Sequence, residues 1–160
     1  MQTRWREEKM TPAIKDKIQI RELHYDSEDY RLELDLRDAV LRKPLGMSIY
    51  NDNLEVDKHD RHIGAFAGEE LVGVLVLTRL SATDVKMRQV AVLEEMQSQG
   101  VGTRMVSFAE DVASEAGYTT MVLHARKTAV PFYLKQGYFT VGDEFLEINI
   151  PHYTMWKDIK

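Results

Sequence analysis

Apolar and polar residues alternate along several segments of the chain and predict a series of β-strands. In the segment KIQIREL, Ile18 and Ile20 fall on one face, as expected for a strand that is buried on one side. Further strands are predicted over 62–67 and 71–80, joined by the turn AGEE, and over 85–93. Three consecutive strands with short connections are typical of an antiparallel meander.

Other segments carry apolar residues at helical spacing. The segment SEDYRLELDLRDAVLR predicts a helix that Asp26 or Ser27 caps and that Pro44 and Gly46 end. The polar, turn-rich segment 47–60 predicts a loop or a short helix. A second helix is predicted from Gly100 up to Gly117, because apolar residues recur there at three- and four-residue steps.

The rest of the chain predicts a short strand, a short helix and a closing pair of strands. TTMVLHA is a short apolar strand, and TAVPFYLKQ is a helix with Pro131 in its first turn. The strand, helix and strand around QSQGVG predict a parallel βαβ unit, so the sheet is mixed. We therefore predict an α+β fold with a mixed, mostly antiparallel sheet of about seven strands that helices flank.

The length of the chain predicts one domain. A chain of 160 residues is close to the usual domain size of roughly 100–150 residues. We assign this domain to 17–160. Residues 1–16 show no clean periodicity and contain Pro12, so we expect an extended amino-terminal arm there.

Composition excludes several classes of protein. A net charge of -5 argues against a nonspecific nucleic-acid binder, and the absence of cysteine excludes disulfides and thiolate chemistry. With neither a long apolar run nor a signal-like amino terminus, we expect a cytoplasmic protein without a membrane span. His59 and His62 in HDRH lack further ligands, so we expect no metal site.

Two glycines, Gly100 and Gly102, stand on either side of the apolar Val101 at the predicted start of the long helix. Unpaired backbone N–H groups at a helix start form a site for phosphate, and glycine lets a ligand approach the main chain. The alternative is a tight turn without a ligand. Neither the dinucleotide fingerprint nor the nucleotide P-loop is complete in GVGTRM.

The runs VAVLEEMQSQGVGTRM and AVPFYLKQGYF, about thirty residues apart, resemble the GNAT superfamily of N-acetyltransferases. Gln97, Gly100 and Gly102 fill the family signature, and the resemblance extends from about Lys17 onward. The segment EFLEINIPHYTMWKD is similar to a small bacterial subset of the family with an IPH strand motif. Asn149 stands where those relatives often have glycine.

The resemblance implies acetyl-CoA as the cofactor. The loop before the long helix would hold the pyrophosphate, and one strand would pair with the amides of the pantetheine arm. We expect the side chains of this strand segment, Val90 to Val92, to be buried. The residues that the resemblance assigns to the cofactor are Val90, Ala91, Val92, Gln97, Ser98, Gln99, Gly100, Val101, Gly102, Thr103, His124 and Tyr133.

The resemblance also implies a proton donor for the leaving thiolate, and Tyr133 in the PFY segment matches the family's tyrosine. A packed aromatic ring without a catalytic role is the alternative. Family members often carry Glu or His on the strand before the glycine loop, but this chain has Lys, Met, Arg and Gln at 86–89. Candidate bases are His152, which we take as catalytic, and His124; a structural role stays open for both.

The acceptor implied by the resemblance is a primary amine of a small molecule. Arg37 and Arg88 are candidates to orient an anionic group on this substrate. Two other functions stay open: a noncatalytic CoA-binding sensor, which the missing strand carboxylate favours, and a protein N-acetyltransferase. A homodimer through the carboxyl-terminal strands is compatible with the family pattern.

Overall fold

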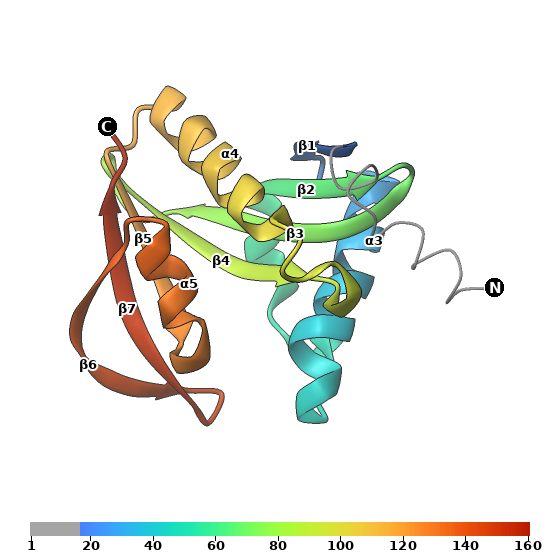
Figure 1. The fold of residues 1–160 in the computed structure, drawn as a ribbon. Coiled ribbons are helices and arrows are strands. Elements are labelled where there is room, and N and C mark those ends of the chain that lie inside the picture. Colours follow the sequence, from blue (N-terminus) through green and yellow to red (C-terminus); the bar gives the residue numbers. More distant parts are fainter. Residues whose placement is uncertain (1–16) are drawn as a thin grey trace. The chain divides into compact units, whose positions relative to one another are not determined.

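The computed structural model describes residues 17–160, in which seven strands form one sheet (Figure 1). The predicted arm over 1–16 lies outside the described residues. The strand order is β1-β2-β3-β4-β5-β7-β6. The strands are β1 (Ile18–Leu23), β2 (Arg61–Ala67), β3 (Glu70–Arg79), β4 (Asp84–Val92), β5 (Thr120–Arg126), β6 (Phe139–Glu147) and β7 (Ile150–Asp158).

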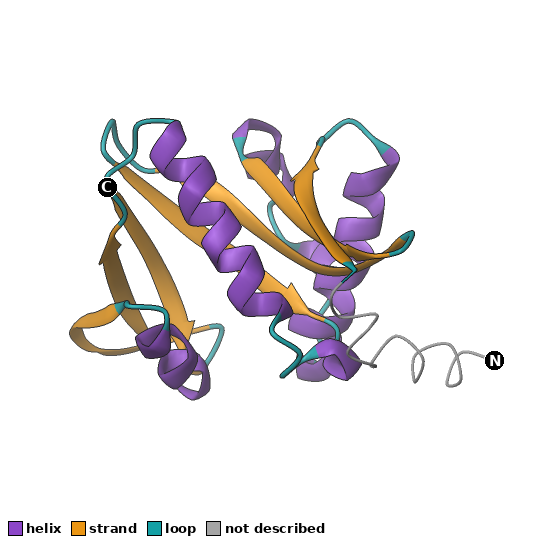
Figure 2. Ribbon diagram, turned by 45° about the horizontal axis from the view of Figure 1, so that its top comes forward, coloured by secondary structure: helices purple, strands orange, loops and turns teal. Residues whose placement is uncertain are grey.

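Within 17–160, three α-helices accompany the sheet; Figure 2 draws them in purple together with the shorter helical turns. They are α3 (Glu28–Arg37), α4 (Val101–Glu115) and α5 (Val130–Lys135). The sheet is mixed and mostly antiparallel, so the predicted fold class is confirmed. The described chain divides into two compact units, 17–76 with 89–109 and 77–88 with 110–160, called unit 1 and unit 2 below.

In unit 1, β1 pairs antiparallel with β2, from Ile18 opposite Ala67 to Leu23 opposite His62. Ser27 is the N-cap of α3, as predicted, although its hydroxyl donates to the His24 carbonyl at 2.7 Å and does not bond the helix. After α3 the chain continues through a π-helical turn to Gly46, which is left-handed at φ 71°. Short 3-10 helices over 49–51 and 54–59 then lead to β2.

The long helix of the sequence prediction is α4, and its first part belongs to unit 1. It packs closely on β3 because Gly73 carries no side chain. A Cβ atom at Gly73 would lie 2.9 Å from the sulfur of Met105, so a larger residue would force the Met105 side chain to move. Val101 and Met105 are buried at this contact.

In unit 2, β4 and β5 run parallel, from Asp84 opposite Thr120 to Met87 opposite Leu123, which confirms the predicted βαβ unit. The strand β7 pairs antiparallel with both β5 and β6. Gly117 is left-handed at φ 98° and ends α4, as predicted. No helix within 17–160 is long and apolar enough to cross a membrane.

Candidate active site

The glycine loop of unit 1 has the backbone geometry of an anion site. Ser98 and Gly100 both adopt left-handed conformations, at φ 66° and φ 82°, immediately before α4 begins at Val101. The side-chain amide of Gln97 donates to the Val92 carbonyl at 3.0 Å, which ties the loop to the end of β4. The first turn of this 15-residue helix presents main-chain N–H groups, a donor set that suits a pyrophosphate.

The strand before the loop is irregular at Gln89. This residue has φ 55° within β4, a left-handed conformation that non-glycine residues rarely adopt, and its side-chain oxygen is buried without a partner among the described residues. A buried acceptor without a donor costs about 1–3 kcal/mol. A ligand that brings an N–H group, such as an amide of pantetheine, fits this position.

The expectation that the segment Val90 to Val92 is buried is correct for Ala91 only. Ala91 belongs to the core cluster around Phe66 and Val74, whereas Val90 and Val92 are half-buried. Alternate residues of a strand point to opposite faces, so one face of this segment packs on the core and the other is partly accessible.

Tyr133 lies in α5 of unit 2 and is buried. Its ring packs edge-on against Phe132 and Tyr138, with centroids 5.0 and 5.7 Å away. Burial raises the pKa of the Tyr133 phenol. The hydroxyl is therefore protonated at neutral pH and can donate a hydrogen bond or a proton, but it cannot act as a base.

The strand registers of unit 2 bring three titratable side chains to one face of the sheet. On β7, His152 lies opposite Arg126 of β5 and Phe145 of β6. His124 lies two residues before Arg126 on β5, and Glu147 lies two residues after Phe145 on β6. Both side chains therefore point to the same face as His152. We call His124, Glu147 and His152 the Glu147 cluster.

His124 contacts Glu147 closely. Its Nδ1 lies 3.0 Å from Oε1 of Glu147 and 3.4 Å from Nζ of Lys86. A single ring nitrogen cannot both donate to a carboxylate and accept from an ammonium group. The shorter contact favours the tautomer in which Nδ1–H donates to Glu147, and in that tautomer the neutral ring carries its lone pair on Nε2.

His152 is more deeply enclosed than His124. Its Nδ1–H donates to the Ile150 carbonyl at 2.7 Å, and its Nε2 lies 3.6 Å from Oε2 of Glu147. The side chain of His152 is 4% exposed, against 29% for His124. Phe145 lies between the two rings, stacked on His152 and edge-on to His124.

Sequence reasoning identified the two histidines of this cluster and missed Glu147. The carboxylate stands at the end of β6, directly before a two-residue turn in which Ile148 and Asn149 have φ 46° and φ 60°. Positive φ at both turn residues is typical of the tight type I′ hairpin, and asparagine is one of the residues that tolerate it. The IPH motif was the available signal, because a tight hairpin before it brings the end of β6 beside β7.

The structure gives Arg37 a different environment from the predicted substrate contact. Its guanidinium is 1% exposed and lies 2.9 Å from both Glu33 and Asp57, which are themselves fully buried. An anionic substrate could not pair with Arg37 without displacing one of these carboxylates. Arg88 lies in unit 2, where its Nε donates to the Thr78 hydroxyl at 2.8 Å.

His62 completes the network around Arg37. Its Nδ1 lies 2.8 Å from Glu33 and its Nε2 lies 2.8 Å from the Asp57 carbonyl, so both ring nitrogens face acceptors. Burial alone lowers the pKa of His62, but the hydrogen bond and charge of Glu33 outweigh it and the pKa is raised. His62 is thus an imidazolium of the core, which we call the His62 network together with Glu33, Arg37 and Asp57.

Within 17–160, no three His, Asp or Glu side chains are arranged so that they could hold a metal ion together.

Comparison with known proteins decides the family. Residues 40–159 match the profile described as the acetyltransferase (GNAT) domain. The chain is an N-acetyltransferase of the GNAT family. A curated relative of this GNAT chain, the uncharacterized N-acetyltransferase YjcF of Bacillus subtilis (strain 168), is 32% identical over 124 residues, which are 77% of this chain and 88% of YjcF.

Solved structures share the GNAT fold of this chain. A putative N-acetyltransferase from Lactobacillus plantarum superposes with a TM-score of 0.82 at 19% identity, covering 89% of this chain and 99% of that one. An aminoglycoside 6'-N-acetyltransferase complexed with coenzyme A gives 0.76 at 18% identity, covering 89% and 97%. Neighbours of this GNAT chain therefore bind coenzyme A in the same fold.

Proposed function

We propose that this GNAT enzyme transfers the acetyl group of acetyl-CoA to a primary amine of a small molecule, by direct attack in a ternary complex. The loop before α4 carries the proposal: two left-handed residues, Ser98 and Gly100, lead into a helix start whose N–H groups suit a diphosphate. Acetyl-CoA, when bound, supplies an activated acetyl thioester.

The residues of unit 1 bind and orient the cofactor in this proposal. Main-chain N–H groups over 98–103 hold the pyrophosphate, and Gln97 supports the loop through its bond to Val92. The segment 90–92 pairs with the pantetheine amides along its partly accessible face. The unpaired side-chain oxygen of Gln89 accepts an N–H group from the same arm.

The residues of unit 2 supply the proton chemistry. Tyr133, whose phenol is protonated, donates to the departing sulfur. The nucleophile must be a neutral amine, so a base has to remove a proton from the ammonium form, and the candidates are His124 and His152. The Glu147 cluster favours an enzyme over a CoA-binding sensor. It provides histidines that can accept a proton, whereas 86–89 contains neither Glu nor His.

Thiol release tests the reaction. Acetyl-CoA is incubated with ethanolamine, L-lysine, spermidine or kanamycin, and free CoA is measured, while calorimetry gives the affinity for acetyl-CoA. We expect micromolar binding and release that depends on at least one of these amines. Tight binding with no release above the amine-free rate would contradict the proposed transfer to a small-molecule primary amine.

A charge change in the first turn of α4 tests the cofactor site separately. Gly102→Glu places a carboxylate beside the proposed pyrophosphate, and like-charge repulsion should weaken acetyl-CoA binding by about tenfold or more. The matched control is Ser107→Glu, which adds the same charge at an exposed position further along the helix. Equal affinities in the two variants would contradict the proposed cradle.

A further inference from the structure

Each carboxylate oxygen of Glu147 faces the imidazole ring of a different histidine. Oε1 lies 3.0 Å from His124 Nδ1, and Oε2 lies 3.6 Å from His152 Nε2. Each of the three side chains comes from a different strand, β5, β6 or β7, so the contact depends on two registers and one tight turn.

From this geometry, and resting on the proposed acetyl transfer, we infer that His124 is the proton acceptor for the amine and that Glu147 is the positioning residue that orients it. The carboxylate accepts the Nδ1–H bond and so leaves the lone pair of the neutral ring on Nε2. The logic is that of a base oriented by a third group, as in carboxylate–histidine pairs of hydrolases.

The proton transfer balances within the cluster. The ammonium group of the acceptor gives one proton to Nε2, the electron pair of the broken N–H bond stays on the amine nitrogen, and the imidazole becomes an imidazolium. Its new positive charge faces the Glu147 carboxylate through Nδ1–H. Because 29% of the His124 side chain is exposed, the proton can then pass to solvent.

His152 does not fit the role of the base as well. Its Nδ1–H is committed to the Ile150 carbonyl, and its Nε2 faces the second oxygen of Glu147, in a side chain that is 4% exposed. These contacts suit a residue that holds Glu147 in place. Phe145 separates the two rings and packs on both, which limits their rotation.

The charges around His124 come from every neighbouring strand. Nζ of Lys86 on β4 lies 3.4 Å from Nδ1 of His124, and Oε1 of Glu147 on β6 lies 3.0 Å from the same nitrogen. On β7, the uncharged Thr154 lies directly opposite, and His152 lies two residues away. Arg126 follows on β5 itself. The ring of His124 therefore has one cationic and one anionic side chain in contact with Nδ1.

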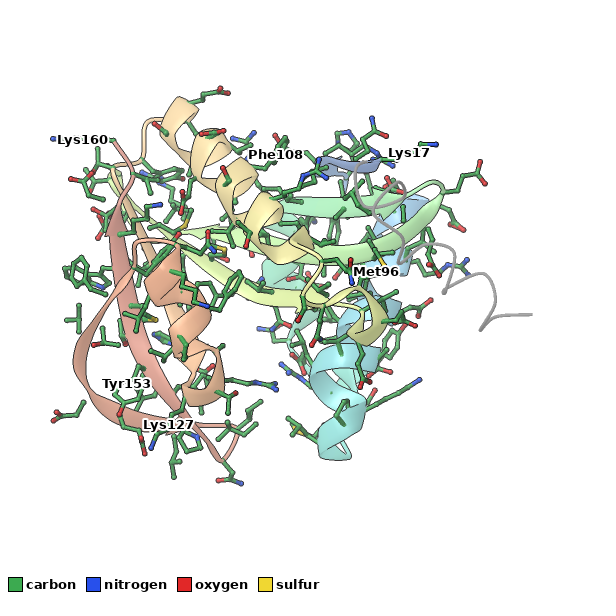
Figure 3. The ribbon with its side chains drawn as sticks, viewed as in Figure 1. Lys17, Met96, Phe108, Lys127, Tyr153 and Lys160 are labelled. Atoms are coloured by element: carbon green, nitrogen blue, oxygen red, sulfur yellow. The ribbon has the colours of Figure 1, made fainter. Side chains whose placement is uncertain are left out.

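The first test needs no substrate. Nitrogen-15 spectra of the histidine side chains in the unliganded protein should show His124 as the Nδ1–H tautomer at a pH where the ring is neutral. Glu147→Gln should reduce that preference. The matched control is Glu144→Gln, which removes a carboxylate from the same strand; Glu144 contacts Lys127 and Tyr153, both labelled in Figure 3, and neither belongs to the cluster. An Nε2–H tautomer in the wild-type protein would overturn the inference.

The second test follows turnover with the amine that releases most CoA in the panel above. His124→Gln should lower kcat by about 100-fold or more and remove the limb of the rate profile that rises through neutral pH, with acetyl-CoA affinity unchanged. Glu147→Gln should lower kcat by about tenfold and change that limb of the rate profile, because the ring loses the carboxylate that orients it. Glu144→Gln should match the wild type.

The outcomes separate the inference from the proposed function. If the wild type binds acetyl-CoA but no amine releases CoA, both fail. If the wild type turns over and His124→Gln keeps its rate and pH profile, only this inference fails. If His124→Gln does not fold, as judged by circular dichroism, the tautomer spectra and the pH–rate profile of Glu147→Gln still test the inference. An unchanged pH–rate profile in a folded Glu147→Gln variant would overturn the role of Glu147.

Discussion

The His62 network of unit 1 and the Glu147 cluster of unit 2 both pair histidine with glutamate, but the two histidine rings differ in their hydrogen-bond partners and in their exposure. In both, an imidazole Nδ1 lies within 3.0 Å of a glutamate oxygen. In the His62 network the second nitrogen also faces an acceptor, and the ring is 1% exposed. In the Glu147 cluster the favoured tautomer leaves a lone pair on Nε2 of a ring that is 29% exposed.

The difference shows what separates the buried His62 from His124, the base that we infer. When both ring nitrogens face acceptors, the ring must carry two protons and has none to accept. Two buried carboxylates, Glu33 and Asp57, need two positive charges, and Arg37 and His62 supply them. Both histidines have a glutamate partner, so the two environments differ in the number of acceptors that face the ring nitrogens.

The largest expected effect comes from breaking the His62 network. Arg37→Met removes one of its two cations and leaves a buried carboxylate uncompensated, which should lower the free energy of unfolding by about 3–5 kcal/mol. The measurement is urea unfolding followed by circular dichroism. The matched control is Arg31→Met in the same helix, where Arg31 is 69% exposed and its pair with Glu28 is worth at most about 0.5 kcal/mol. Similar losses in the two variants would show that the network is not a structural unit.

A second prediction uses the charge of His62. Its pKa is raised in the folded protein, so its contribution to stability is fully present below about 6.5, the ordinary pKa of histidine, and is lost as the pH rises through the folded-state pKa. His62→Gln should cost about 1–3 kcal/mol at pH 6, because Glu33 loses a charged partner. The difference in unfolding free energy between wild type and variant should shrink from pH 6 to pH 9.

The control for this prediction is His24→Gln, since His24 is an exposed residue. Its unfolding free energy should follow the wild type across the same pH range. If the wild type and His62→Gln differ by the same amount at pH 6 and at pH 9, His62 is not charged in the folded protein, and the contrast between the two histidine environments disappears.

The strands and helices could be predicted from the sequence because their signals are local. Alternation in KIQIREL and the three- and four-residue steps after Gly100 each lie within one element, and the observed β1 and α4 match them closely. The glycine loop could be predicted for the same reason. Glycine adopts left-handed conformations readily, and Gly100 does so here.

The environments of Arg37 and Glu147 could not be predicted because they depend on partners far along the chain. Arg37 meets Asp57, twenty residues away, and nothing in DLRDAVL distinguishes a buried arginine from one on the surface. Glu147 meets His124 across two strand pairings, with a register shift between Val141 and Phe145 on β6. A shift of one residue in either pairing would turn the carboxylate to the other face.

The smallest expected effect concerns the turn that carries Glu147. Ile148 is β-branched and has φ 46°, a conformation that costs such residues about 1 kcal/mol. Ile148→Asn should keep the turn and raise the free energy of unfolding by up to about 1 kcal/mol, since asparagine tolerates this conformation and 38% of Ile148 is already exposed. Asn149→Gly, at the neighbouring turn position, should change stability less, and urea unfolding of the two variants measures the difference. If Ile148→Asn destabilises the protein, the packing of the isoleucine outweighs its strain, and the turn depends on that side chain to hold Glu147 against His124.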